Sequence, residues 1–211
     1  KKVTLESLRE RLKTIVFQAQ LGTIYEKTER VAALAVYIAG QLNADKKLAE
    51  RAGQLCKSDL VTNMVGEFDN MQGIAGFYYG QKDGEDKEVY WALKEQYLPK
   101  FAGDELPSTT TGAAVALADR LDTLSGIFGL GQVPTGSKDP FGLRRASVAV
   151  LRILVEKQYN LDLRELLQEA ASRHSFLTNR KESVEQALTY MLERFRAWYE
   201  EKNIPGVVYQ A

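Results

Sequence analysis

Apolar residues recur every three or four positions along most of this chain, and this spacing restricts the fold more than any other feature. Between 184 and 200, for example, one helical face carries Leu188, Met191, Leu192, Phe195 and Trp198. No stretch alternates between apolar and polar residues over the length of a strand, and no internal repeat of about 20 to 50 residues is present. The sequence therefore predicts an all-α fold.

The same spacing predicts where the helices lie. We expect residues 1–211 to form a single domain and residues 203–211 to form a flexible end. Three glycines and three aromatic residues within 71–80 indicate close helix packing or a bent segment. The predicted helices cover about 4–19, 24–42, 46–64, a stretch ending near 97, a stretch beginning near 113, and then 144–156, 162–173 and 184–200.

Composition limits the class of protein. Lysine plus arginine and aspartate plus glutamate both number 28, so the net charge of zero argues against a dedicated basic nucleic-acid-binding module but permits a local basic patch. The single cysteine, Cys56, excludes an internal disulfide and fits a reducing cytoplasm. No apolar run reaches membrane-spanning length, and the chain starts with Lys1 and Lys2 instead of Met or a signal peptide. We expect a cytoplasmic piece of a larger protein with no membrane partner.

The stretch from Ala113 to Arg145 is the most informative part of the sequence. It begins as a helix in which Asp119 and Asp122 lie one turn apart on the same face, and glycines and prolines after Gly126 are expected to end that helix. The two carboxylates either hold a divalent metal with help from elsewhere or form cap and salt-bridge contacts, for example with Arg120 or Lys57.

Further charged residues also have two interpretations. Lys57 and Asp59 either lie on a solvated helix face or point towards Asp119 in a cleft. The basic residues after the glycine-rich loop either contact phosphates or form structural salt bridges with Asp139 or Asp122. These basic residues are Lys138, Arg144 and Arg145.

Known catalytic motifs do not fit the glycine-rich loop. Gly131 to Gly136 has the spacing that begins a Walker A motif, but Ser137-Lys138 follows where Lys-Ser or Lys-Thr is required. The dinucleotide-binding fingerprint needs glycine at position 134, which is Pro134, and no Gly-x-Ser-x-Gly elbow occurs. The single histidine, His174, is expected to be an ordinary helix-end histidine.

Blocks of sequence in a specific order resemble one family. The chain is similar to an internal part of the β subunit of bacterial heterotetrameric (α2β2) glycyl-tRNA synthetase. The number and order of these sequence blocks make the resemblance specific over almost the whole chain. The blocks are 57–65, 67–68, 72–73, 97–99, 101–104, 116–124, 126–128, 134–136, 138–141, 143–145 and 194–199.

This resemblance implies an HD-domain-like helical bundle with a degenerate metal site. HD phosphohydrolases bind metal through an early His, a His-Asp pair and a late Asp, and only the late Asp is matched, by Asp119. The early His position falls near Lys27, and the His-Asp position falls near Cys56 and Lys57. Asp119 therefore resembles the remnant of a metal site, and a hydrolase without its metal ligands lacks the means to activate water.

The resemblance also implies a role in tRNA(Gly) aminoacylation. The whole ligase uses ATP and Mg, with catalysis in the α subunit, and no cofactor is expected in this piece, which alone is expected to be inactive. Partners are the α subunit, the other domains of the β subunit and tRNA(Gly). The first hypothesis is therefore a non-catalytic tRNA-interacting or scaffolding domain; the alternatives are a residual metal-dependent phosphohydrolase and a purely architectural packing module. Candidate tRNA contacts are Lys138, Arg144, Arg145, Lys57 and Arg120.

Overall fold

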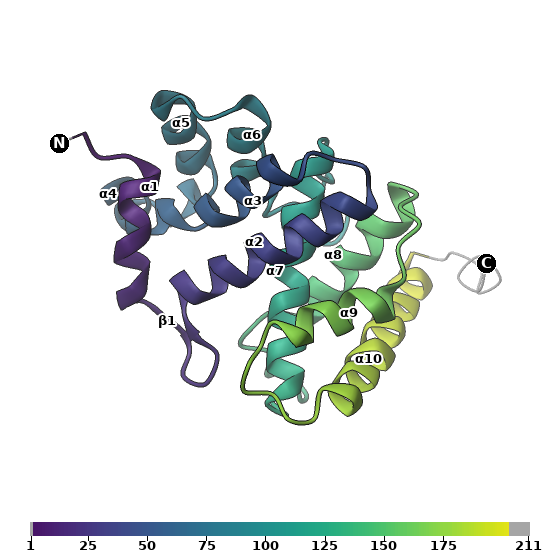
Figure 1. Cartoon of the computed structure of the whole chain (residues 1–211). Coiled ribbons are helices and arrows are strands. Elements are labelled where there is room, and N and C mark those ends of the chain that lie inside the picture. Colours follow the sequence, from purple (N-terminus) through teal and green to yellow (C-terminus); the bar gives the residue numbers. More distant parts are fainter. Residues whose placement is uncertain (1, 203–211) are drawn as a thin grey trace. The chain divides into compact units, whose positions relative to one another are not determined.

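The structure is a computed structural model that describes residues 2–202. Within this range it contains ten α-helices, short 3-10 turns and one two-stranded sheet, which confirms the all-α class (Figure 1). The chain divides into two compact units: Lys1–Pro99 with Glu105–Asp119, and Lys100–Asp104 with Arg120–Ala211. The boundary falls inside helix α7 (Thr110–Gly129). The flexible end expected at 203–211 lies outside the described residues, and the single domain stays a prediction.

The first predicted helix, 4–19, is wrong as one continuous element. Helix α1 (Leu5–Leu8), capped by Thr4, passes into a 3-10 helix (Arg9–Thr14). The chain then forms strand β1 (Val16–Gln18), which pairs antiparallel with β2 (Gly22–Thr23). The β-branched and aromatic residues Val16 and Phe17 favour extended backbone, and Val16 is exposed instead of lying on a buried helix face.

Helices α2 (Ile24–Gln41) and α3 (Lys46–Leu55) pack closely in the first unit. A Cβ atom added at Gly53 would lie 2.6 Å from the Cα atom of Ala32, so only glycine permits this approach. Thr23 caps α2 with a reciprocal contact to Glu26, which explains why the helix begins at the predicted position.

The predicted helix over 46–64 is also wrong, because α3 stops at Leu55. A 3-10 turn (Ser58–Val61), helix α4 (Asn63–Glu67) and a second 3-10 turn (Asp69–Met71) follow. The break lets the buried carboxylate of Asp59 accept hydrogen bonds from the backbone amides of Gly73 (2.7 Å) and Gly76 (3.1 Å). Asp59 thereby caps the next helix, α5 (Ile74–Asp83), which has no side-chain cap of its own.

Helices α5 and α6 (Lys87–Glu95) form a tight antiparallel hairpin. The turn contains Gly84 in the left-handed conformation, which glycine adopts without a clash because it has no Cβ atom. A Cβ atom at Gly80 would lie 3.0 Å from the Cβ atom of Tyr90, and one at Gly76 would lie 3.5 Å from that of Leu93. The glycines of 71–80 therefore serve close helix packing, the first of the two sequence-based interpretations.

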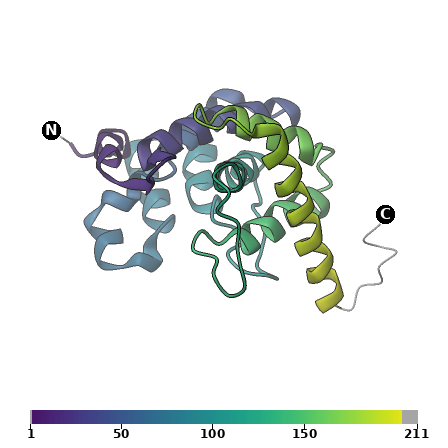
Figure 2. The same cartoon turned by 90° about the horizontal axis from the view of Figure 1, so that it is seen from below.

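In the second unit, α10 (Arg180–Glu201) packs against α8 (Leu143–Glu156) and α9 (Leu163–Ser172). Met191 and Phe195 of the predicted apolar stripe are buried, whereas Leu192 is 40% exposed and does not belong to the core. Helix α7 continues through Gly126 to Gly129, three residues beyond the predicted break. Figure 2 views α7 nearly end-on, with the loop that leads from it to α8. No helix within 2–202 combines the length and apolarity that crossing a membrane requires.

Candidate functional site

Three segments of the first unit bring Lys27, Lys57 and Asp119 together. Lys27 lies in the first turn of α2, Lys57 follows the end of α3, and Asp119 lies on α7. The Nζ atom of Lys57 is 2.9 Å from Oδ2 of Asp119, and the Nζ atom of Lys27 is 3.3 Å from its Oδ1. All three side chains are largely enclosed, with 7%, 4% and 14% of the Lys57, Lys27 and Asp119 side chains exposed. We call these residues the lysine–aspartate cluster.

Neighbouring groups fix the two ammonium groups. The Nζ atom of Lys57 donates a second hydrogen bond to Oε1 of Gln96 (3.0 Å) and lies 4.3 Å from the centre of the Tyr97 ring. The Nε2 atom of Gln96 donates to the carbonyls of Cys56 and Leu93, which leaves its Oε1 atom directed at Lys57. Lys27 lies 4.4 Å from the centre of the Phe17 ring. Two cation–π contacts thus accompany a cluster that has one more positive than negative charge.

The surroundings of the cluster keep Lys57 charged and keep the Cys56 thiol and the Tyr97 phenol neutral. Burial alone would lower the pKa of Lys57, but Asp119, Tyr97 and Cys56 together outweigh burial and raise that pKa above its ordinary value. Burial raises the pKa of the Cys56 thiol to about 12, and it also raises the pKa of the Tyr97 phenol. Lys57 is therefore unsuited to act as a nucleophile, which needs a neutral amine, and Cys56 is unsuited to act as a thiolate.

The residues of the cluster do not fit a divalent metal. Both carboxylate oxygens of Asp119 face an ammonium group, so a cation would have to displace two buried lysines to reach either oxygen. Imidazoles are missing at the positions near 27 and 56–57, and within the described residues no group of three or more His, Cys, Asp or Glu side chains is placed to hold a metal ion. The donor set is that of an ion cluster and not that of a metal centre.

The other acidic candidates have separate partners. Of the two interpretations of Lys57 and Asp59, the solvated face is wrong for both, since both are buried; Lys57 does reach Asp119, whereas Asp59 caps α5. In the second unit, Nε2 of His174 lies 3.1 Å from the carbonyl oxygen and 3.3 Å from Oδ1 of Asp122. His174 does follow the end of α9, but it is a buried partner of Asp122, which its position at a helix end did not indicate.

The predicted basic residues near α8 lie in the second unit and are more accessible. Lys138 is exposed and follows a tight turn closed by two backbone hydrogen bonds between Thr135 and Lys138. Asp139 caps α8 by accepting from the backbone amides of Leu143 (2.8 Å) and Arg144 (3.0 Å). The Arg144 guanidinium donates to the carbonyl of Gly136, and the Arg145 side chain is exposed. A structural salt bridge with Asp139 was one of two interpretations of these basic residues; in the structure the Asp139 carboxylate accepts from backbone amides, and the Arg144 guanidinium donates to a backbone carbonyl.

Arg120 lies half-buried on α7, directly after Asp119, and its predicted role, like that of Lys57, stays a prediction. Sequence reasoning missed Gln96 and Tyr97 as members of the cluster environment. Both follow the last residue of α6, where apolar spacing gives no signal, although Tyr97 opens one of the blocks on which the family resemblance depends.

Comparison with known proteins decides the family. The sequence profile of the family described as "Glycyl-tRNA synthetase beta subunit" matches residues 1–211. The chain belongs to the glycyl-tRNA synthetase beta subunit family. Proteins named glycine–tRNA ligase beta subunit are 54% identical in Pseudomonas aeruginosa (strain LESB58), over 100% of this chain and 31% of that protein, and 56% identical in Hahella chejuensis, over 99% and 30%.

The chain therefore spans about a third of the length of these glycyl-tRNA synthetase beta subunits. The crystal structure of Bacillus subtilis YpgQ is similar over 89% of this chain and 96% of that chain, with a TM-score of 0.42 and 20% identity. A likeness at this level carries no argument about fold or function.

Proposed function

We propose that this part of the glycyl-tRNA synthetase beta subunit is a non-catalytic domain that contacts tRNA(Gly) and positions it for aminoacylation. In this proposal glycine activation with ATP and Mg takes place in the α subunit, and the domain works within an α2β2 assembly. The domain contributes binding and orientation, so its loss affects the use of tRNA and not the activation of glycine.

The lysine–aspartate cluster is the observation that carries the non-catalytic part of the proposal. The resemblance matches Asp119 to the late Asp of HD phosphohydrolases and places Lys27 and Lys57 near the positions of their other metal ligands. Both ammonium groups lie within 3.3 Å of the Asp119 carboxylate. This convergence supports an HD-like arrangement in which lysines take the place of metal ligands. A buried ammonium neither activates water nor polarises a phosphate as a metal ion does, so we assign the cluster a structural role.

The accessible cations of the second unit carry the tRNA-contacting part of the proposal. Lys138 and Arg145 are exposed and form no ion pair in the described part of the chain, and Arg144 is held at the same loop by the Gly136 carbonyl. Exposed arginine and lysine side chains on an ordered loop are typical phosphate contacts. Lys57, in contrast, is enclosed by Asp119, Gln96 and Tyr97, so we assign it to support of the fold.

Steady-state kinetics of the whole enzyme test the proposal. The double substitution R144A/R145A should raise the KM for tRNA(Gly) and leave glycine-dependent ATP–pyrophosphate exchange unchanged. Losing about two phosphate contacts should also flatten the dependence of log affinity on log salt by about 1 to 2 units. The control K46A/K47A removes the same charge from the exposed start of α3 and should leave both quantities unchanged.

An equal fall in aminoacylation and exchange would show that the arginines are structural. An unchanged KM in R144A/R145A, with normal exchange, would favour the purely architectural role instead.

A further inference from the structure

We propose that the α5–α6 hairpin of the first unit carries a second nucleic-acid contact, a stacking surface for unpaired nucleotides of an RNA. The inference deepens the proposed role in an RNA-binding ligase, but it depends on different residues from Lys138, Arg144 and Arg145. We call this surface the aromatic platform. It consists of Phe77 and Tyr78 on α5 and of Tyr90, Trp91 and Lys94 on α6.

The platform is a group of aromatic rings in mutual edge-to-face contact. The Phe77 ring lies at its centre, 5.1 Å from the ring of Tyr78, 5.2 Å from that of Tyr90 and 5.0 Å from that of Trp91, with interplanar angles of 89°, 85° and 71°. Tyr78 is 60% exposed, and Phe77, Tyr90 and Trp91 are partly exposed. Tyr78 is the most exposed of these rings, and every base has a π-face that can stack on an exposed aromatic ring.

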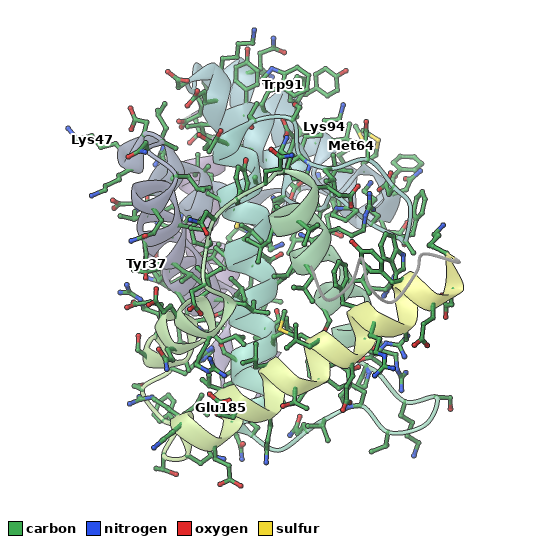
Figure 3. The ribbon with its side chains drawn as sticks, turned by 90° about the vertical axis from the view of Figure 1, so that its right-hand side faces the viewer. Tyr37, Lys47, Met64, Trp91, Lys94 and Glu185 are labelled. Atoms are coloured by element: carbon green, nitrogen blue, oxygen red, sulfur yellow. The ribbon has the colours of Figure 1, made fainter. Side chains whose placement is uncertain are left out.

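A positive charge lies over the rings. The Nζ atom of Lys94 is 5.7 Å from the centre of the Phe77 ring and 5.6 Å from that of Trp91. Lys87 lies one helical turn before Trp91 on the same stripe of α6, and both lysines are exposed. Neither lysine forms an ion pair within residues 2–202. Figure 3 shows Trp91 and Lys94 close together, with Lys47 of α3 well away from them.

The carboxylates of α6 are turned away from the platform. Glu88 lies 3.2 Å from the hydroxyl of Thr111, and the buried Glu95 accepts hydrogen bonds from Ser108 and Thr109 at 3.0 Å each. Both glutamates therefore face the start of α7. One side of α6 thus carries aromatic rings and lysines without ion pairs, and the opposite side carries the glutamates. This arrangement matches a ligand that combines flat bases with anionic phosphates. A protein partner of average composition would not require this separation.

Binding of short RNAs to the full chain tests the inference. The probe is a fluorescently labelled RNA of about eight nucleotides containing only adenine and cytosine, which forms no duplex, and the readout is anisotropy at several salt concentrations. Substituting Tyr78→Ala should weaken binding about tenfold, since one stacked base is lost. Substituting Lys94→Ala should reduce the slope of log affinity against log salt by about 0.7.

Matched controls separate the platform from general charge and aromatic effects. Phe176→Ala removes an exposed ring that belongs to the other unit, and Lys47→Ala removes an exposed charge from α3; both should leave affinity within about twofold. The duplex that the same strand forms with its complement should bind more weakly than the single strand. The inference is overturned if the single strand does not bind, if Tyr78→Ala behaves like Phe176→Ala, or if the duplex binds equally well.

The two proposals fail in different ways. If R144A/R145A leaves the KM for tRNA(Gly) unchanged while Tyr78→Ala weakens binding of the single-stranded RNA, the aromatic platform is supported and the tRNA contact of Arg144 and Arg145 is refuted. The opposite pattern overturns the platform and leaves the loop contact in place.

Discussion

Neutralising Asp119 should destabilise the chain more than removing either lysine of the cluster. The carboxylate of Asp119 contacts both ammonium groups, so Asp119→Asn removes the ion pair with Lys57 and the ion pair with Lys27 at once, in a largely enclosed place. Removing one partner of a buried ion pair costs about 3–5 kcal/mol of unfolding free energy. Because 14% of the Asp119 side chain is exposed and water can partly screen the charges, we expect a loss of about 3 kcal/mol.

The substitution Lys57→Met gives the informative contrast. It leaves a neutral pair of Lys27 and Asp119, and the straight methionine side chain fills much of the same space. The cost is then the loss of the charge-assisted hydrogen bonds that Lys57 donates to Asp119 and Gln96, about 1–2 kcal/mol. The control Asp69→Asn removes a charge from an exposed position and should change stability by less than about 0.5 kcal/mol.

Urea unfolding followed by far-ultraviolet circular dichroism measures these differences. For a slope of about 2–3 kcal/mol per molar urea, Asp119→Asn should lower the midpoint by about 1–1.5 M. The prediction is refuted if Asp119→Asn costs no more than Lys57→Met, because losing both ion pairs of Asp119 would then cost no more than losing one.

Two further predictions concern the first unit. Burial raises the Cys56 pKa from 9.0 to about 12, so the stability that this neutral thiol contributes is complete below pH 9 and is lost as pH rises. Above about pH 9 the unfolding free energy should fall by up to about 1.4 kcal/mol per pH unit. Urea titrations at successive pH values measure this slope, and Cys56→Ala should remove this part of it. Gly53→Ala should lower the thermal midpoint through a loss of about 1–3 kcal/mol of unfolding free energy, because its Cβ atom would lie 2.6 Å from the Cα atom of Ala32. The control is Gly66→Ala, where an added Cβ atom meets nothing within 4 Å. An equal effect of both substitutions would contradict the close approach of Gly53 to Ala32.

The sequence predicts the long helices well because their apolar spacing and caps act locally. Helix α2 was expected at 24–42 and spans Ile24–Gln41, and α8 was expected at 144–156 and spans Leu143–Glu156. Prediction from the sequence is wrong where tertiary contacts override the apolar spacing. The break after Leu55 depends on Asp59 reaching the amides of Gly73 and Gly76, which lie 14 and 17 residues further along the chain.

The candidate site was predictable only in part. The contact of Lys57 with Asp119 was one of two interpretations of the sequence, and the family resemblance placed Lys27 near the early His position without giving its partner. Nothing in the spacing indicated that Gln96 would direct its amide oxygen at Lys57, since that geometry depends on two backbone carbonyls, those of Cys56 and Leu93. Networks of this kind join residues far apart in sequence and leave no periodic signal.

Crosslinking of the whole enzyme to tRNA tests the central claim most directly. A photoreactive amino acid at position 145, itself one of the predicted contacts and exposed, should crosslink to tRNA(Gly) bound to the α2β2 enzyme. Excess unlabelled tRNA(Gly) should abolish the crosslink. The same group at position 47, on the exposed start of α3, should give no crosslink. A crosslink from 47 and none from 145, or none from either, would contradict a tRNA-contacting role for the start of α8 and the loop before it.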